Sequence, residues 1–295
     1  MKYSYYPGCT FDSTGKEYDM SFKTVCSMLD IELKGVKNWI CCGASSAHLN
    51  SKLLFVSLSI KNLAEVEKEN LSEIVVPCVG CYSSFKKAIY EIEKNSKLKD
   101  NVCEVIDYPF QNKVKVLNPI EIFQNGNNII EEKIKKITKK DLSKLKIVCY
   151  YGCVLTRPAK IMQYDICEYP VSMDEILKNA GVNVLDWSYK TECCGVSLNF
   201  TNPEIVLRLA NNIFENARDV GADAIAVACP LCHINLDTRQ KEVNKTYNKD
   251  YNIPIFYFTQ LMGLGLGVGT KQLGLDTHFV NPDKLIKKNI AEVLE

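Results

Sequence analysis

A cysteine pattern that occurs twice constrains the fold of this chain more than any other feature. A single cysteine after glycine, an adjacent pair before glycine and a CxxC unit follow one another in the first half, and the second half repeats this order. The intervals between units are 31 and 35 residues in the first copy and 39 and 34 in the second. This repetition indicates an internal duplication. The first copy comprises Cys9, Cys41, Cys42, Cys78 and Cys81, and the second comprises Cys153, Cys193, Cys194, Cys229 and Cys232.

Each cysteine unit follows an apolar run that is typical of a β-strand. The six runs are residues 2–6, 36–40, 73–76, 145–151, 182–187 and 224–228. Between them lie helical patterns, for example residues 47–70 and 203–222. Alternating strands and helices predict an α/β fold with two pseudo-symmetric halves, each a small, mainly parallel sheet flanked by helices. Ligands bind beyond the carboxyl ends of the strands in such sheets, so we expect the five cysteines of each half to converge there.

Two segments without the cysteine pattern complete the predicted organisation. Residues 103–140 are expected to hold connecting helices and the linker, which places the first half at residues 1–140 and the second at 141–295. Residues 253–275 are apolar but interrupted by proline, glutamine, glycines and lysine, so they predict a buried strand followed by an apolar helix or loop. With no secretory signal at the N-terminus either, we expect a cytoplasmic protein without a membrane segment.

Charge and cysteine content narrow the class of function. The 36 Lys and Arg residues are balanced by 35 Asp and Glu residues, which argues against nucleic-acid binding. In a long cytoplasmic chain, 14 cysteines point to metal or redox chemistry rather than to disulfides. The four cysteines outside the repeated pattern, to which we assign no function, are expected to pack in the core: Cys26, Cys103, Cys149 and Cys167.

Five thiolates per half suggest more than a single metal ion. Thiolates suit iron–sulfur clusters, zinc or copper(I), and a structural zinc ion takes four ligands. Adjacent cysteines do not easily chelate one small ion, but they can bind two metal atoms of one cluster. The pairs at Cys41 and Cys193 therefore favour a multinuclear site. A structural zinc ion in one half remains the alternative.

The phrases around the cysteines resemble a known family, the cysteine-rich CCG domain, and in particular the B subunits of methanogen heterodisulfide reductases. The resemblance covers nearly the whole chain. The phrases that carry it are "CCGASSAH", "SLSIKNLAEVE" and "PCVGCYSSFKKA" in the first half, and "YYGCVLTRPA", "SMDEIL", "DWSYKTECCGVSLNF" and "GADAIAVACPLCHINLDTRQ" in the second.

This resemblance implies that the chain is the catalytic part of an oxidoreductase that acts on a sulfur–sulfur bond. It implies two noncubane 4Fe-4S clusters, one held by each set of five cysteines, which face each other across an active site. The implied substrate is the mixed disulfide of coenzyme M and coenzyme B, which is reduced to the two thiols in methanogenesis. The implied partners are the ferredoxin-like iron–sulfur C subunit and the flavin-bearing A subunit of such complexes, together with a hydrogenase or formate dehydrogenase.

Four further side chains are candidate helpers at this site. His48 and His233 lie close to cysteine units and are candidates to donate to a cluster sulfur or to protonate a leaving thiolate. Arg157 and Lys190 are candidates to bind the anionic groups of the implied substrate. For each of the four, an ordinary structural or solvated role is the alternative.

Two other functions stay open. The chain lacks a ferredoxin-like cysteine run and a GxGxxG fingerprint, so we expect no NAD or flavin on it and electrons from a partner. The first alternative is a CCG-domain electron-transfer protein within another oxidoreductase, linked to a quinone or to a 2-hydroxy acid. A zinc-stabilised assembly module without enzymatic activity is the second.

Overall fold

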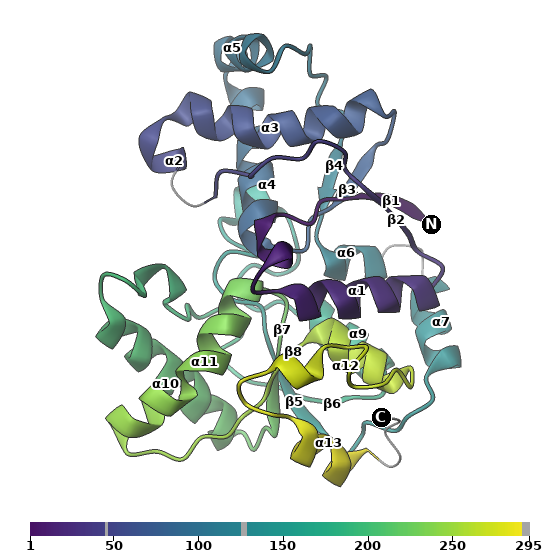
Figure 1. Cartoon of the computed structure of the whole chain (residues 1–295), viewed down its shortest axis with the longest axis vertical. Coiled ribbons are helices and arrows are strands. Elements are labelled where there is room, and N and C mark those ends of the chain that lie inside the picture. The colour runs from purple at the N-terminus through teal and green to yellow at the C-terminus, as the bar shows by residue number, and fades with distance from the viewer. Residues whose placement is uncertain (45–46, 125–128, 291–295) are drawn as a thin grey trace.

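The fold consists of two four-stranded parallel sheets that share one strand order (Figure 1). The structure is a computed structural model that describes residues 1–44, 47–124 and 129–290. The first sheet has the order β2-β1-β3-β4, with β1 (Lys2–Tyr5), β2 (Glu32–Gly35), β3 (Glu73–Val75) and β4 (Lys115–Leu117). The second has the order β6-β5-β7-β8, with β5 (Lys146–Tyr150), β6 (Asn183–Leu185), β7 (Ala224–Val227) and β8 (Ile255–Tyr257). The predicted α/β fold with two equivalent parallel sheets is confirmed.

Helices connect the strands in both halves. In the first half they are η1 (Cys9–Asp12), α1 (Lys16–Met28), α2 (Ala47–Asn50), α3 (Lys52–Lys68), α4 (Val79–Lys94), α5 (Ser96–Ile106), α6 (Pro119–Gln124) and α7 (Ile129–Ile137). In the second they are α8 (Ala159–Met162), α9 (Ser172–Asn179), η2 (Val196–Leu198), α10 (Pro203–Asp219), α11 (Pro230–Tyr247), α12 (Phe258–Gly265), η3 (Leu275–Thr277) and α13 (Asp283–Asn289). None of the helices in the described ranges has the length and apolar character needed to cross a bilayer.

The strand predicted at residues 36–40 is wrong. The pairing of β1 with β2 runs from Lys2 opposite Glu32 to Tyr5 opposite Gly35, so the strand ends before this run. The chain then turns, and the N–H of Ile40 donates to the side chain of Asn62 at 2.8 Å instead of to a neighbouring strand. This departure from the sheet carries the cysteine pair toward the other cysteines.

Two other expectations need correction in detail. The segment 103–140 also contains β4, a three-residue strand at the edge of the first sheet that is too short to stand out from its polar surroundings. The helix predicted over residues 47–70 is divided into α2 and α3, because the Ser51 side chain accepts a hydrogen bond from the N–H of Leu54 and begins a new helix. The division of the chain at residue 140 falls between α7 and β5 and stays a prediction.

Helix α1 joins the two halves. It lies between the two sheets and packs against α12, which follows the last strand of the second sheet (Figure 1). Tyr18 of α1 stacks on Tyr257, with ring centroids 4.3 Å apart. The hydroxyls of Ser21 and Thr259 form a buried hydrogen bond of 2.7 Å. The junction is therefore part of the continuous core and fixes one sheet relative to the other.

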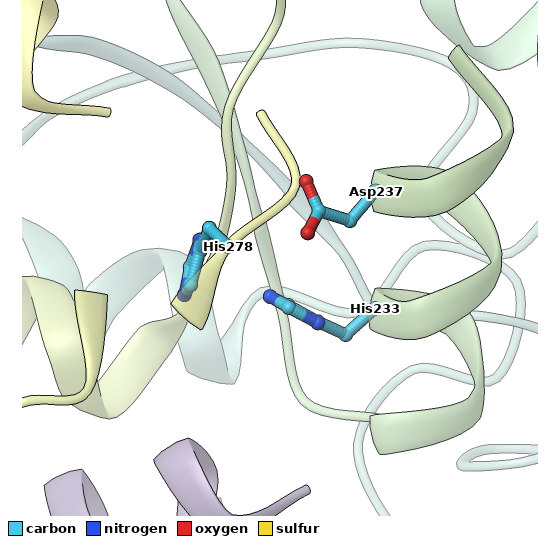
Figure 2. Close-up of side chains that lie close together, drawn as sticks. All are labelled: His233, Asp237 and His278. Atoms are coloured by element: carbon cyan, nitrogen blue, oxygen red, sulfur yellow. The ribbon is translucent and has the colours of Figure 1, made fainter. Parts of the chain in front are cut away.

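A buried polar cluster borders this junction. Figure 2 shows His233, Asp237 and His278. Each offers one side-chain atom that could bind a metal ion, and these three atoms lie within 4.8 Å of one another. His233 Nε2 is 2.9 Å from the carbonyl oxygen of Ile255. The side-chain amide of Gln260 donates to His278 Nε2 at 3.0 Å. The Asp237 carboxylate accepts hydrogen bonds from the two backbone N–H groups that follow His278. These bonds engage both carboxylate oxygens and both Nε2 atoms, so the cluster ties together α11, α12 and the segment after η3. The Nδ1 atoms of His233 and His278 are buried and have no hydrogen-bond partner in the described part of the chain.

Removing a large side chain from the junction is expected to destabilise the whole chain. Phe258 is fully buried and contacts the rings of Tyr18 and Phe123 from the first half. Phe258→Ala should lower the free energy of unfolding by about 3–5 kcal/mol, measured by urea denaturation. Phe200, whose side chain is 101% exposed, provides the matched control, and Phe200→Ala should change stability by less than about 0.5 kcal/mol. Equal effects of the two variants would contradict this role for the junction.

His278 should make the protein less stable as the pH falls. Burial lowers its pKa in the folded chain to about 4, whereas the unfolded chain has the ordinary value near 6.5. Between these values the unfolded state binds more protons, so stability is lost as the pH falls through this window. From pH 7 to pH 5 the loss from His278 should be about 2 kcal/mol. Denaturation of wild type and His278→Gln at both pH values checks this, because the variant should lose less by that amount.

Candidate functional site

The five cysteines of the first half gather at the carboxyl edge of its sheet. Cys9 follows β1, the pair at Cys41 and Cys42 follows β2, and Cys78 caps α4, with Cys81 in its first turn. The Sγ atoms of Cys42 and Cys81 are 2.9 Å apart. Burial raises the pKa of Cys9, and the nearby charges of Cys41, Cys42 and Cys78 add to this rise. The five thiols therefore form one electrostatically coupled group.

The second half repeats this arrangement. Cys153 follows β5, the pair at Cys193 and Cys194 follows β6, and Cys229 caps α11, with Cys232 in its first turn. The Sγ atoms of Cys194 and Cys232 are 3.6 Å apart. Because corresponding strands end at the same edge, the duplicated pattern gives two corresponding thiol groups.

Hydrogen bonds between thiols favour the thiolate form at particular positions. Hydrogen bonding with Cys81 lowers the pKa of Cys42, and it lowers the pKa of Cys78 to about 6. In the second half, Cys153 lowers the pKa of Cys193 to about 6, and Cys232 lowers that of Cys194. The thiolate is the form that binds metals, so these four cysteines are suited to act as ligands. The same hydrogen bonds raise the pKa of the partner thiols Cys81, Cys153 and Cys232.

A tyrosine holds the cysteine pair in place in each half. The hydroxyl of Tyr6 donates to the carbonyl oxygen of Ile40, immediately before Cys41, at 2.8 Å. The hydroxyl of Tyr150 donates to the carbonyl oxygen of Glu192, immediately before Cys193, at 2.7 Å. Burial, with the neighbouring cysteines, raises the pKa of both tyrosines, so they remain protonated donors. Neither tyrosine was predicted from the sequence, although the repeat Tyr-x-Gly-Cys at Tyr6 and Tyr150 was a usable signal.

Glycine is required beside each group. Gly8 and Gly152 have φ values of +67° and +73°, which side-chain-bearing residues rarely adopt. A Cβ atom on Gly8 would lie 3.3 Å from Cys81 Sγ, and one on Gly152 would lie 3.2 Å from Cys232 Sγ. The glycines therefore leave the space in which the sulfurs meet.

A cavity of about 350 Å³ lies between the two halves. All five cysteines of the second group line it. The first half contributes Ala44 and Gly80, which adjoin its own cysteine units, and further residues of α4. The remaining lining is largely apolar and includes Phe55, Val154 and Leu231. The second thiol group therefore lines the cavity directly, whereas none of the five cysteines of the first group lines it.

The four predicted helper residues occupy different places. His48 lines the cavity. Arg157 pairs with Glu168 and donates to the backbone carbonyl of Thr191, whereas the ammonium of Lys190, 2% exposed, forms a buried ion pair of 2.7 Å with Asp174. His233 is buried in the polar cluster beside the junction, where burial lowers its pKa. Arg157, Lys190 and His233 thus have structural partners and do not line the cavity.

The four unassigned cysteines lie outside both thiol groups. Cys26 in α1 and Cys149 in β5 are buried in the core, as expected. Cys103 is half-buried at the margin of the core. Cys167 is also half-buried, and its Sγ contacts the carbonyl oxygen of Thr156 at 3.3 Å, so the expectation of core packing is wrong for it.

The donor sets fit an iron–sulfur cluster. All fourteen cysteines are free thiols, and the shortest sulfur–sulfur distances given above exceed the roughly 2.05 Å of a disulfide. Backbone N–H groups of Gly43 and Gly195 donate to Cys41 Sγ at 3.4 Å and to Cys193 Sγ at 3.3 Å. Such N–H···S bonds and sulfur-only donors are features of iron–sulfur sites.

Proteins of similar sequence include subunits of oxidoreductases. The chain is 27% identical to the 8-methylmenaquinol:fumarate reductase membrane anchor subunit of Wolinella succinogenes, over 96% of this chain and 99% of the relative. It is also 27% identical to the B subunit of the ferredoxin/F420H2-dependent CoB-CoM heterodisulfide reductase of Methanosarcina acetivorans, over 97% of this chain and 96% of the relative. The B subunit of the ferredoxin:CoB-CoM heterodisulfide reductase of Methanosarcina mazei has the same identity and coverage.

Structure comparison supports the fold. A hypothetical protein from Helicobacter pylori aligns with a TM-score of 0.72 and 13% identity, over 95% of this chain. The aligned region is 52% of that solved chain, so this chain spans about half its length.

The family model for the cysteine-rich CCG domain matches twice, at residues 3–86 and 147–237. Each match contains one complete set of five cysteines and three of the four strands of the corresponding sheet, whereas β4 and β8 lie outside the matched ranges. Together the two matches cover more than half of the chain, and the chain belongs to the cysteine-rich CCG-domain family.

Proposed function

We propose that this chain is an iron–sulfur subunit of an oxidoreductase complex and that it reduces the mixed disulfide of coenzyme M and coenzyme B. The observation that carries the proposal is the cavity between the halves, which is lined by all five cysteines of the second group and by Ala44 and Gly80, which adjoin cysteine units of the first. The similarity to the B subunits of two heterodisulfide reductases over nearly the full length supports it.

Two noncubane 4Fe-4S clusters are the proposed cofactors. Cys9, Cys41, Cys42, Cys78 and Cys81 would hold one, and Cys153, Cys193, Cys194, Cys229 and Cys232 the other. Each cluster, when bound, supplies one-electron transfer, and cleaving a disulfide to two thiols takes two electrons and two protons. The protein's own contribution is to orient the sulfur–sulfur bond in a largely apolar cavity and to keep water away from it. The electrons would come from a ferredoxin-like iron–sulfur partner and a flavin-bearing partner, the C and A subunits of such a complex, fed by a hydrogenase or formate dehydrogenase.

A quinol-linked protein is the second candidate. The fumarate reductase relative is as similar as the heterodisulfide reductase relatives, and an apolar cavity also suits a quinone ring. The polar groups that line the cavity favour the charged disulfide over a quinone as its ligand. Lys87 lines it, and no carboxylate forms an ion pair with this lysine anywhere in residues 1–44, 47–124 and 129–290. An unpaired cation suits an anionic substrate better than a neutral quinone.

Metal content tests the two-cluster proposal. Anaerobically purified protein should contain about eight iron atoms and about eight acid-labile sulfides per chain. About four of each would leave one half without a cluster and would refute the arrangement of two clusters. Stoichiometric zinc with little iron would indicate a structural zinc module instead.

A matched pair of variants assigns the iron to the two halves. Cys232→Ser should lose about half of the iron together with one cluster signal in electron paramagnetic resonance spectra, because Cys232 lies in the middle of the second group. Cys103 lies outside both groups, so the Cys103→Ser variant should retain the full iron content. Full iron content in Cys232→Ser would contradict the assignment.

Turnover separates the two candidate functions. Reduced protein should convert the mixed disulfide to the two thiols, measured as free thiol released over time with a chemical reductant. It should not oxidise a soluble menaquinol analogue at a comparable rate. Oxidation of the quinol without thiol release would refute disulfide reduction and favour the quinol-linked function.

A further inference from the structure

Helix α4 presents a polar stripe to the cavity. Gly80, Ser83, Ser84 and Lys87 all line it. Their spacing of three, four and seven residues from Gly80 places them on one face of the helix. The opposite wall of the cavity is formed by the cysteines of the second half. The first half thus contributes a helix face, rather than its thiols, to the wall opposite these cysteines.

Ser83 has an unused hydroxyl in this stripe. Its side chain is 2% exposed, and Oγ has no hydrogen-bond partner within the described part of the chain. The neighbouring hydroxyl of Ser84 is already engaged, since it donates to the carbonyl oxygen of Gly80 at 3.0 Å. Buried polar atoms almost always have a partner in folded proteins. The Ser83 hydroxyl therefore lies at the cavity wall with its hydrogen-bonding capacity unused.

Lys87 lies one helical turn beyond Ser83 on the same face and supplies the positive charge. No aspartate or glutamate lines the cavity, and Lys87 has no ion-pair partner among the residues that the structure describes. The adjacent Lys86 differs, because its ammonium lies over the ring of Tyr82, outside the cavity. The stripe therefore combines a free cation with a free hydroxyl, the combination that binds an oxyanion.

We infer that Ser83 and Lys87 form a subsite for the anionic end of the disulfide substrate, a sulfonate, carboxylate or phosphate group. Holding this end on α4 places the sulfur–sulfur bond against the second thiol group across the cavity. The inference rests on the proposed function for its substrate. On this inference, the first half determines specificity for charged disulfides. The sulfur–sulfur bond faces the cysteines of the second half.

Kinetics with two substrates test the subsite. With the mixed disulfide of coenzyme M and coenzyme B, Lys87→Met should raise KM at least tenfold. With the neutral 2-hydroxyethyl disulfide it should change kcat/KM less than twofold. Lys87→Arg should retain most of the affinity, and Ser83→Ala should raise KM for the anionic substrate alone. Lys86→Met is the matched control and should leave both substrates unaffected. Equal losses on both substrates, or no loss, would overturn the inference.

A binding measurement keeps this test independent of the proposed reaction. Ethanesulfonate should bind to the iron-loaded wild-type protein in calorimetry, and ethyl methyl sulfone, which is uncharged, should not. Binding should be lost in Lys87→Met and kept in Lys86→Met, with iron content equal in all three proteins. If wild type reduces neither disulfide but binds ethanesulfonate through Lys87, the proposed reaction fails and the subsite stands. If ethanesulfonate binding does not depend on Lys87, the subsite fails.

Discussion

The convergence of five thiols at one edge of a parallel sheet is the constraint on which the rest of this structure depends. Three strands of each sheet end at a common edge, and the chain segments that follow them carry the cysteine units. Strand direction alone brings the units near one another. The close contact between the sulfur atoms also depends on two residues in each half. A buried tyrosine anchors the segment before the cysteine pair, and a glycine lies beside the second CxxC sulfur.

Duplication has produced similar groups with unequal surroundings. The second group lines the cavity, whereas no cysteine of the first group does, and Ala44 and the start of α4 line it instead. In the second half, the buried pair of Lys190 and Asp174 also holds Tyr151, whose hydroxyl donates to Asp174 at 2.6 Å. Tyr151 lines the cavity just before Cys153. The backbone carbonyl of Lys190 accepts from the N–H of Tyr151 at 2.8 Å, so this network braces the segment before each of two cysteine units.

The position of the cavity depends on the junction between the halves. Helix α1 begins shortly after Cys9 and packs against α12, which follows directly from the last strand of the second sheet. Its contacts are aromatic stacking and a buried hydroxyl pair, so they resist sliding of one sheet over the other. A ligand that must touch α4 on one side and thiols on the other requires this fixed geometry.

The sequence by itself determined the duplication, the α/β class and the ten cysteines that gather at the sheet edges, because these follow from local periodicity and from the rule that parallel strands share a carboxyl edge. It did not locate β2 correctly and missed β4, since both strands are short and depend on pairing with distant partners. The tertiary structure decided which charged residues face the cavity. Lys190 and Arg157 lie near cysteines in sequence but have buried or local partners, whereas Lys87 faces the second half from a helix of the first. That placement depends on how two separately encoded sheets pack together, which no local sequence pattern contains.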